Sequence, residues 1–76
     1  RKDYKSKLQE ITQKLYKHRP VYSLIESLGP EHDKTYHVRV DIPNGNSFHA
    51  RESSIKKAEQ MAAQTAISAL DPNELP

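Results

Sequence analysis

The chain lacks cysteine and tryptophan, and it contains no long apolar run. Without cysteine it has no disulfide framework, no thiolate metal site and no cysteine nucleophile. Its histidines are scattered, with no paired ligand spacing, at positions 18, 32, 37 and 49. The longest apolar runs reach two or three residues, so we expect neither a membrane-spanning helix nor a secretory leader. We therefore expect an intracellular, cytoplasmic protein that makes no contact with membranes.

The only methionine is Met61, so the 76 residues do not begin at a start codon. We expect one small domain cut from a longer protein, near the lower size limit for a self-sufficient core. The net charge of +2 is unevenly distributed. Residues 1–19 hold seven Lys/Arg against two acids, whereas residues 20–76 hold five against eight. Such asymmetry favours a polyanionic partner.

A first helix is predicted from an Asp3 cap to about His18, where Pro20 disfavours its continuation. An apolar stripe at helical spacing marks its buried face, with Thr12 and Tyr16 at the edge: Tyr4, Leu8, Ile11 and Leu15. Gln9 and Gln13 lie one above the other beside this stripe, with Ser6 near them.

Three strands follow in the middle of the chain. Residues 21–28 are rich in β-branched and aromatic residues, and Gly29-Pro30 ends them before a polar loop that holds His32. Residues 36–42 alternate apolar and polar side chains, and Asn44-Gly45 predicts a hairpin into a strand over residues 47–51.

A second helix is predicted from Ser53 or Ser54 to about Leu70. Its apolar face is expected at helical spacing, over residues 58, 61, 62, 65, 66, 69 and 70, and Ile55 is expected to pack inward with it. Lys56, Gln60 and Gln64 are placed on the far side, with Lys57 at its flank. Unpaired N–H groups and two lysines at the amino end suit an anion, although a solvated surface helix has the same pattern.

The order helix, strand, strand, strand, helix predicts an α+β fold (α-β-β-β-α). Short connections favour a three-stranded antiparallel sheet, and two roughly parallel helices bury their stripes on one of its faces. The opposite face, with His37, Arg39 and Asp41, is expected to stay exposed. The domain is assigned to residues 3–70 and a flexible C-terminal tail to residues 71–76.

The chain resembles the double-stranded RNA-binding domain, and most of all the one at the carboxyl end of ribonuclease III of bacterial or dicer-like type. Four separated motifs carry the resemblance in the family's order and spacing. They are Asp3-Tyr4-Lys5-Ser6-Lys7-Leu8-Gln9-Glu10-Ile11, Pro20-Val21-Tyr22, Gly29-Pro30-Glu31-His32 and Lys56-Lys57-Ala58-Glu59-Gln60-Met61-Ala62-Ala63.

The resemblance implies binding of double-stranded RNA by A-form shape, through two successive minor grooves and the phosphates between them. Gln9 and Gln13, with Ser6 a weaker match, correspond to one minor-groove contact. His32 matches the other, with Pro30 stiffening its loop. Ser54 and Lys56 match phosphate contacts, and Lys57 is an addition.

The resemblance further implies that the parent protein is an endoribonuclease, homodimeric through a catalytic domain absent here, and that magnesium belongs only to that domain. The chain itself shows no nucleophile–base pair, no metal-ligand cluster and no glycine-rich phosphate loop. We therefore expect no cofactor, small-molecule ligand or catalysis in this chain.

Three residues depart from the family pattern. Ile55 stands where the family has the first of two adjacent lysines or arginines, and Ala50 and Glu52 stand where glycines are common. One phosphate contact is thus missing or moved, to Lys57 or Arg51, and we expect modest affinity. The alternative is a protein-interaction domain of the same fold, using the exposed sheet face or the outer side of the second helix, with Ile67 and Ala63.

Overall fold

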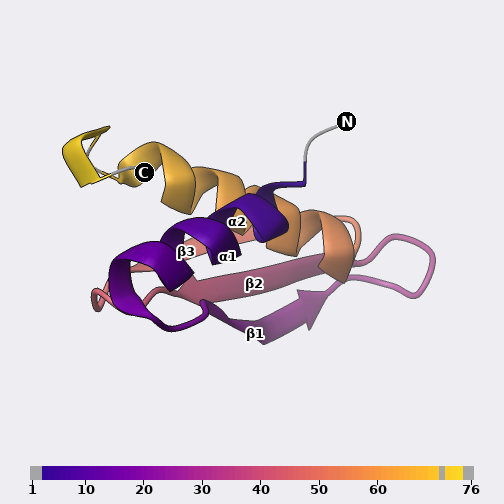
Figure 1. The fold of residues 1–76 in the computed structure, drawn as a ribbon. Coiled ribbons are helices and arrows are strands. Elements are labelled where there is room, and N and C mark those ends of the chain that lie inside the picture. The colour runs from indigo at the N-terminus through magenta and orange to yellow at the C-terminus, as the bar shows by residue number, and fades with distance from the viewer. Residues whose placement is uncertain (1–2, 71, 75–76) are drawn as a thin grey trace.

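The computed structural model describes residues 3–70 and 72–74, and its elements follow in the predicted order. The antiparallel sheet has the strand order β1-β2-β3, and both helices lie on one face of it, running in the same direction (Figure 1). This arrangement confirms the α+β fold. The elements are α1 (Tyr4–Tyr16), β1 (Val21–Leu28), β2 (Thr35–Asp41), β3 (Ser47–Glu52), α2 (Ile55–Ala69) and a short 3-10 helix η1 (Pro72–Glu74).

The core lies between the helices and the sheet. Leu8 and Ile11 of α1 pack with Val40 of β2 and with Ile42, the residue after the end of β2. The contribution of α2 is mostly alanine, which lets its backbone approach both neighbours closely, and consists of Ala62, Ala63, Ala66 and, beyond the helix end, Leu70.

The first helix has the predicted start but ends earlier than expected. The Asp3 carboxylate accepts a hydrogen bond from the Ser6 backbone N–H at 3.2 Å, which confirms the cap. The helix ends at Tyr16 rather than near His18, because Lys17 adopts a left-handed conformation (φ 63°) and its N–H bonds to the Gln13 carbonyl. Lys17 thus ends the helix before the constraint from Pro20 applies.

The second helix has the predicted bounds, with Ser54 as its cap, but its buried face is rotated. Met61, Thr65 and Ala69 were expected in the core and are exposed, whereas Ala63 is fully buried and Ile67 packs against the core. The rotation arises because α2 packs against α1 as well as the sheet, so its buried arc faces two neighbours. The prediction that Ala63 and Ile67 form an outer contact surface is therefore wrong.

Two further expectations about α2 are also wrong. Gln60 and Gln64 do not lie on the far side, because their amides bond to residues at the start of α1. The Ile55 side chain is 41% exposed rather than packed inward. Helical spacing gives the direction of a side chain but not how far the core extends along the helix.

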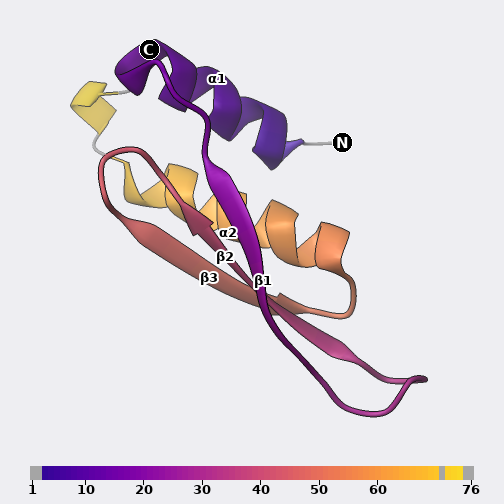
Figure 2. The same cartoon turned by 90° about the horizontal axis from the view of Figure 1, so that it is seen from below.

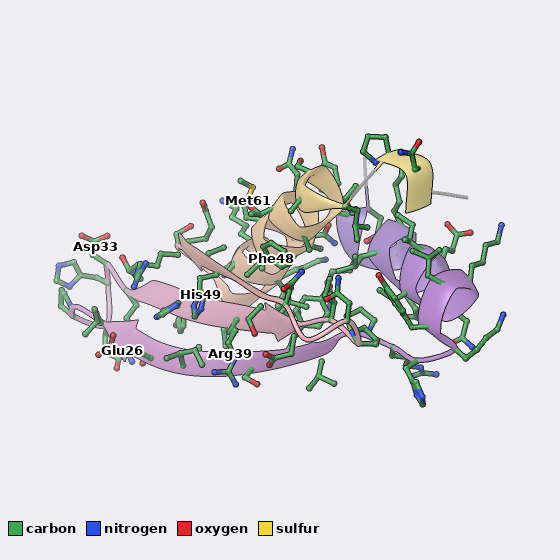
Figure 3. The ribbon with its side chains drawn as sticks, turned by 90° about the vertical axis from the view of Figure 1, so that its left-hand side faces the viewer. Glu26, Asp33, Arg39, Phe48, His49 and Met61 are labelled. Carbon is green, nitrogen blue, oxygen red and sulfur yellow. The ribbon has the colours of Figure 1, made fainter. Side chains whose placement is uncertain are left out.

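The sheet leaves its second face open, as predicted. On this face His37 is hydrogen-bonded to His49 (Nε2 to Nδ1, 2.7 Å), and Arg39 pairs with Asp41 at 3.0 Å. Figure 3 shows Arg39 pointing away from the helices, whereas Phe48 points toward them. Partial burial and the nearby charge of Arg51 lower the pKa of His37.

Pro72–Glu74 form the short helix η1, while residues 71 and 75–76 of the predicted flexible tail lie outside the described residues. Over the part of the chain that is described, no helix has both the length and the apolar character needed to cross a bilayer.

Candidate nucleic-acid interface

The outer face of α1 presents two glutamines to solvent. Gln9 and Gln13 are exposed, and within residues 3–70 and 72–74 their side-chain amides form no hydrogen bond. Together with Ser6 and Glu10 they line a shallow surface depression. Each amide can donate and accept, so this face suits partners that offer hydroxyl groups and mixed donor and acceptor edges.

Ser6 has a structural task in addition to the one predicted. Its hydroxyl donates to the Asp3 carboxylate at 2.8 Å, beside the bond from its own backbone N–H. Ser6 therefore belongs to the cap of α1, and its oxygen is left to accept from a partner.

The amino end of α2 brings together the residues that were predicted to form an anion site. The Ser54 hydroxyl oxygen accepts from the Lys57 backbone N–H at 3.1 Å, so its own hydrogen remains available to a ligand. Lys56 and Lys57 are exposed and, so far as the described chain extends, neither side chain has an ion-pair partner. The free N–H groups of the first turn and the positive end of the helix dipole add to their charge.

Four hydrogen bonds or ion pairs tie the start of α1 to α2. The Gln60 amide oxygen accepts from the Tyr4 backbone N–H at 2.8 Å, and its nitrogen donates to the Asp3 carboxylate at 2.9 Å. Lys5 pairs with Glu59 at 2.6 Å. The Gln64 amide donates to the Tyr4 hydroxyl at 3.2 Å. These contacts fix the face of α1 relative to the α2 tip.

Beside these contacts lies a surface depression between the amino ends of the helices and the start of β1. We call it the α1–α2 hollow. The predicted residues Ser6, Gln9 and Lys56 come together on its wall. Its full lining is Asp3, Lys5, Ser6, Gln9, Arg19, Pro20, Tyr22, Lys56 and Gln60.

Some charged groups at the α1–α2 hollow already interact with other residues of the domain. Hydrogen bonds from Gln60 and Ser6 lower the pKa of Asp3 to about 2, so its carboxylate is ionised at neutral pH. Burial raises the pKa of Tyr22 to about 12, helped by the negative charges of Glu59 and Asp3. The Lys5 ammonium lies 4.9 Å from the centre of the Tyr22 ring.

Sequence reasoning missed Arg19 and Lys5 as members of this surface. Lys5 could have been found, because it precedes Gln9 by four residues and shares its helix face. Arg19 could not, since only the path of the chain beneath α1 brings it to the α1–α2 hollow.

The loop between β1 and β2 stands apart from the hollow. It projects at the end of the sheet, and in both ribbon views the amino end of α2 lies between this loop and α1 (Figure 2). Gly29 opens the loop with φ +95°, and the Asp33 N–H bonds to the Pro30 carbonyl at 2.9 Å. His32 and Pro30 are exposed, and no described residue bonds to the His32 ring. The predicted residues thus lie in two regions, one at the α1–α2 hollow with the α2 tip and the other in this loop.

The described residues hold no cluster of three or more His, Cys, Asp or Glu side chains that could bind a metal ion. The strongest apolar exposure lies on β1, an edge strand with a bulge between Leu24 and Glu26. It involves Val21, Leu24, Ile25 and Leu28.

Comparison with known proteins gives concordant results. Residues 4–70 match the family model described as the double-stranded RNA binding motif. The chain is 60% identical over 70 residues to ribonuclease 3 of Nitratidesulfovibrio vulgaris, which covers 92% of the chain and 28% of that protein. It is 50% identical to ribonuclease 3 of Oleidesulfovibrio alaskensis, covering 92% of the chain and 31% of the relative. For ribonuclease 3 of Aquifex aeolicus the identity is 45%, covering 97% and 33%. The chain therefore spans about three tenths of the length of these relatives.

Proposed function

The chain belongs to the double-stranded RNA binding motif family, and we propose that it binds double-stranded RNA by the shape of the A-form duplex. The observation that carries this proposal is the meeting of Ser6, Gln9 and Lys56 at one hollow beside the cationic tip of α2. Amides and cations that lie together suit a surface on which ribose hydroxyls and phosphates alternate.

Each group of residues has a separate task in this proposal. Gln9 and Gln13, with Ser6 beside them, contact 2′-hydroxyls and base edges in one minor groove. Lys56, Lys57 and the Ser54 hydroxyl bind phosphates across the adjacent major groove, where the helix dipole adds to their attraction. His32, on the loop stiffened by Pro30, enters the next minor groove.

The proposal extends to the longer protein that the relatives suggest. We assign the chain as the RNA-binding part of a ribonuclease III-type endoribonuclease in the bacterial cytoplasm. Catalysis, its divalent metal (magnesium) and homodimerisation are assigned to a further domain. No step of RNA cleavage is assigned to the residues of this chain.

A comparison of RNA with DNA tests the proposal. The chain is titrated with RNA and DNA duplexes of equal length and sequence at one salt concentration, and binding is followed by calorimetry or gel shift. We expect tighter binding to RNA, because only RNA offers 2′-hydroxyls and the wide minor groove of the A form. Equal affinity for the two duplexes would refute recognition by A-form shape.

One observation favours a second candidate function, a protein-interaction domain. Edge strand β1 exposes four large apolar side chains next to an open sheet face, and such patches commonly mark contact surfaces. Under this alternative the chain sediments with a protein partner and not with RNA. The same titration separates the two candidates, since a pure protein-interaction domain would bind neither duplex.

A further inference from the structure

The tip of α2 has one cation fewer than the family pattern, because Ile55 occupies the place of a lysine or arginine. We ask which other cation lies beside Lys56, an inference that rests on the proposed function. Ile55, in the first turn of α2, is 41% exposed and carries no charge, so it offers a phosphate no cation.

Neither replacement suggested by sequence, Arg51 or Lys57, lies at the α1–α2 hollow. Arg51 is the register partner of His37, and both side chains lie on the open face of the sheet, away from the helices. Lys57 belongs to the α2 tip but is not part of the lining of the α1–α2 hollow, where Ser6 and Gln9 meet Lys56. Neither residue adds a cation beside the α1 contacts.

Arg19 supplies a cation at the same hollow as Lys56. It lines the α1–α2 hollow together with Ser6, Gln9 and Lys56. Its side chain is exposed, and over residues 3–70 and 72–74 its guanidinium has no ion-pair or hydrogen-bond partner. The other added cation of the hollow, Lys5, is already paired with Glu59 at 2.6 Å.

The chain path explains how a residue beyond α1 reaches this place. After α1 the backbone turns back beneath the helix before β1 begins, as Figure 2 shows. Pro20 and Tyr22, which follow Arg19, line the same hollow and hold this turn against the domain. A guanidinium presents a planar fork of N–H donors that matches two oxygens of one phosphate.

We propose that Arg19 is a further RNA-contacting residue, which binds the same stretch of phosphodiester backbone as Lys56. The contact is to phosphate and reads no base. It links the α1 contacts to those of the α2 tip.

The test compares Arg19→Gln with Arg51→Gln, which removes the same side chain from the opposite face of the molecule. Affinity for one RNA duplex is measured over a series of salt concentrations, and circular dichroism checks that each variant is folded. Since one phosphate contact changes the logarithmic salt slope by about 0.9, we expect Arg19→Gln to lower affinity about tenfold at 0.1 M salt and to flatten the slope by about one. Arg51→Gln leaves both values unchanged, and Arg19→Lys keeps most of the slope.

Lys56→Gln separates the fate of this inference from that of the proposed function. If Lys56→Gln weakens binding while Arg19→Gln does not, the Arg19 contact is overturned and the proposed function stands. An equal loss in Arg19→Gln and Arg51→Gln would also overturn it, because only general charge would then be at work. If the unaltered chain binds no duplex RNA, both the function and the contact fall.

Discussion

A single amide, that of Gln60, joins the two helices at the point where the candidate interface is assembled. Its oxygen accepts the first N–H of α1, from Tyr4, and its nitrogen donates to the Asp3 cap. An N–H of the first helical turn has no partner within its own helix, so Gln60 supplies from α2 what α1 lacks. Asp3, Ser6 and Gln60 thereby set the orientation of α1 above the hollow.

Asp3 should make the domain sensitive to acid. Its pKa is about 2 in the folded chain against an ordinary value of 3.8, so its contribution to stability is complete above about pH 4 and is lost as the pH falls toward 2. We expect Asp3→Asn to be less stable than the unaltered chain at neutral pH and to lose this difference between pH 4 and 2. Urea unfolding at a series of pH values measures it.

Asp33→Asn serves as the matched control, because the Asp33 carboxylate lies in an exposed loop and has no hydrogen bond to any described residue. It should show no such convergence with the unaltered chain. A stability difference for Asp3→Asn that stays constant from pH 7 to pH 2 would contradict the role of its ionised carboxylate.

At the scale of elements, the loop between β1 and β2 depends on a backbone conformation that favours glycine. Gly29 and Gly45 both have φ +95°, which costs an L-residue about 1–2 kcal/mol. They differ in their surroundings. A Cβ added at Gly29 would meet the Asp33 carbonyl oxygen at 2.6 Å, whereas one at Gly45 would meet nothing within 4 Å.

Gly29→Ala should therefore cost more stability than Gly45→Ala. We expect about 1 kcal/mol for Gly45→Ala and about 2–3 kcal/mol for Gly29→Ala, because the latter must also move the loop backbone. Gly29→Ala should weaken RNA binding too, by displacing His32, whereas Gly45→Ala should not. Thermal unfolding and RNA titration measure the two effects, and equal behaviour of the two variants would contradict the close approach at Asp33.

At the scale of the whole molecule, the candidate contacts belong to an elongated domain of 43 × 27 × 16 Å, in two regions: the α1–α2 hollow with the α2 tip, and the loop between β1 and β2. Helix α1 and the loop lie on opposite sides of the amino end of α2 (Figures 1 and 2). Domains of this family cover about 16 base pairs and reach two successive minor grooves. A short duplex should engage the contacts at the hollow and leave those of the loop unused.

The dependence on duplex length should consequently differ between variants. We expect His32→Ala to weaken binding to an RNA stem of about 16 base pairs by roughly three- to tenfold, the value of one hydrogen bond, and to have little effect on a stem of about 8 base pairs. Lys56→Gln should weaken binding to both stems. Equal losses for His32→Ala on the two stems would show that loop and hollow do not act in separate grooves.

Much of the candidate site followed from local sequence. The Ser54 cap, the Lys56 and Lys57 tip, the Gln9 and Gln13 pair and the His32 loop each depend on a few neighbouring residues, and each element formed within a few residues of its predicted bounds. The assignment of these residues to RNA remains a proposal, as does their action together.

Local spacing gave wrong positions for Gln60 and Ile55 of α2, and it could not predict that Arg19 lies at the hollow. The period of the helix gave Gln60 an outward direction, but α1 packs along that side and turns Gln60 into a tie between helices. Ile55 was expected in the core and is 41% exposed. Periodicity orders side chains around one axis and carries no information on how many partners surround that axis.

The sequence by itself therefore determined the elements, their order and the local chemistry of each group, because caps, turns and periodicities depend on residues a few positions apart. The tertiary structure alone decided which side chains meet. The rotation of α2 and the placing of Arg19 beside Lys56 depend on contacts between segments far apart in the chain, and packing of one helix against two neighbours sets those contacts.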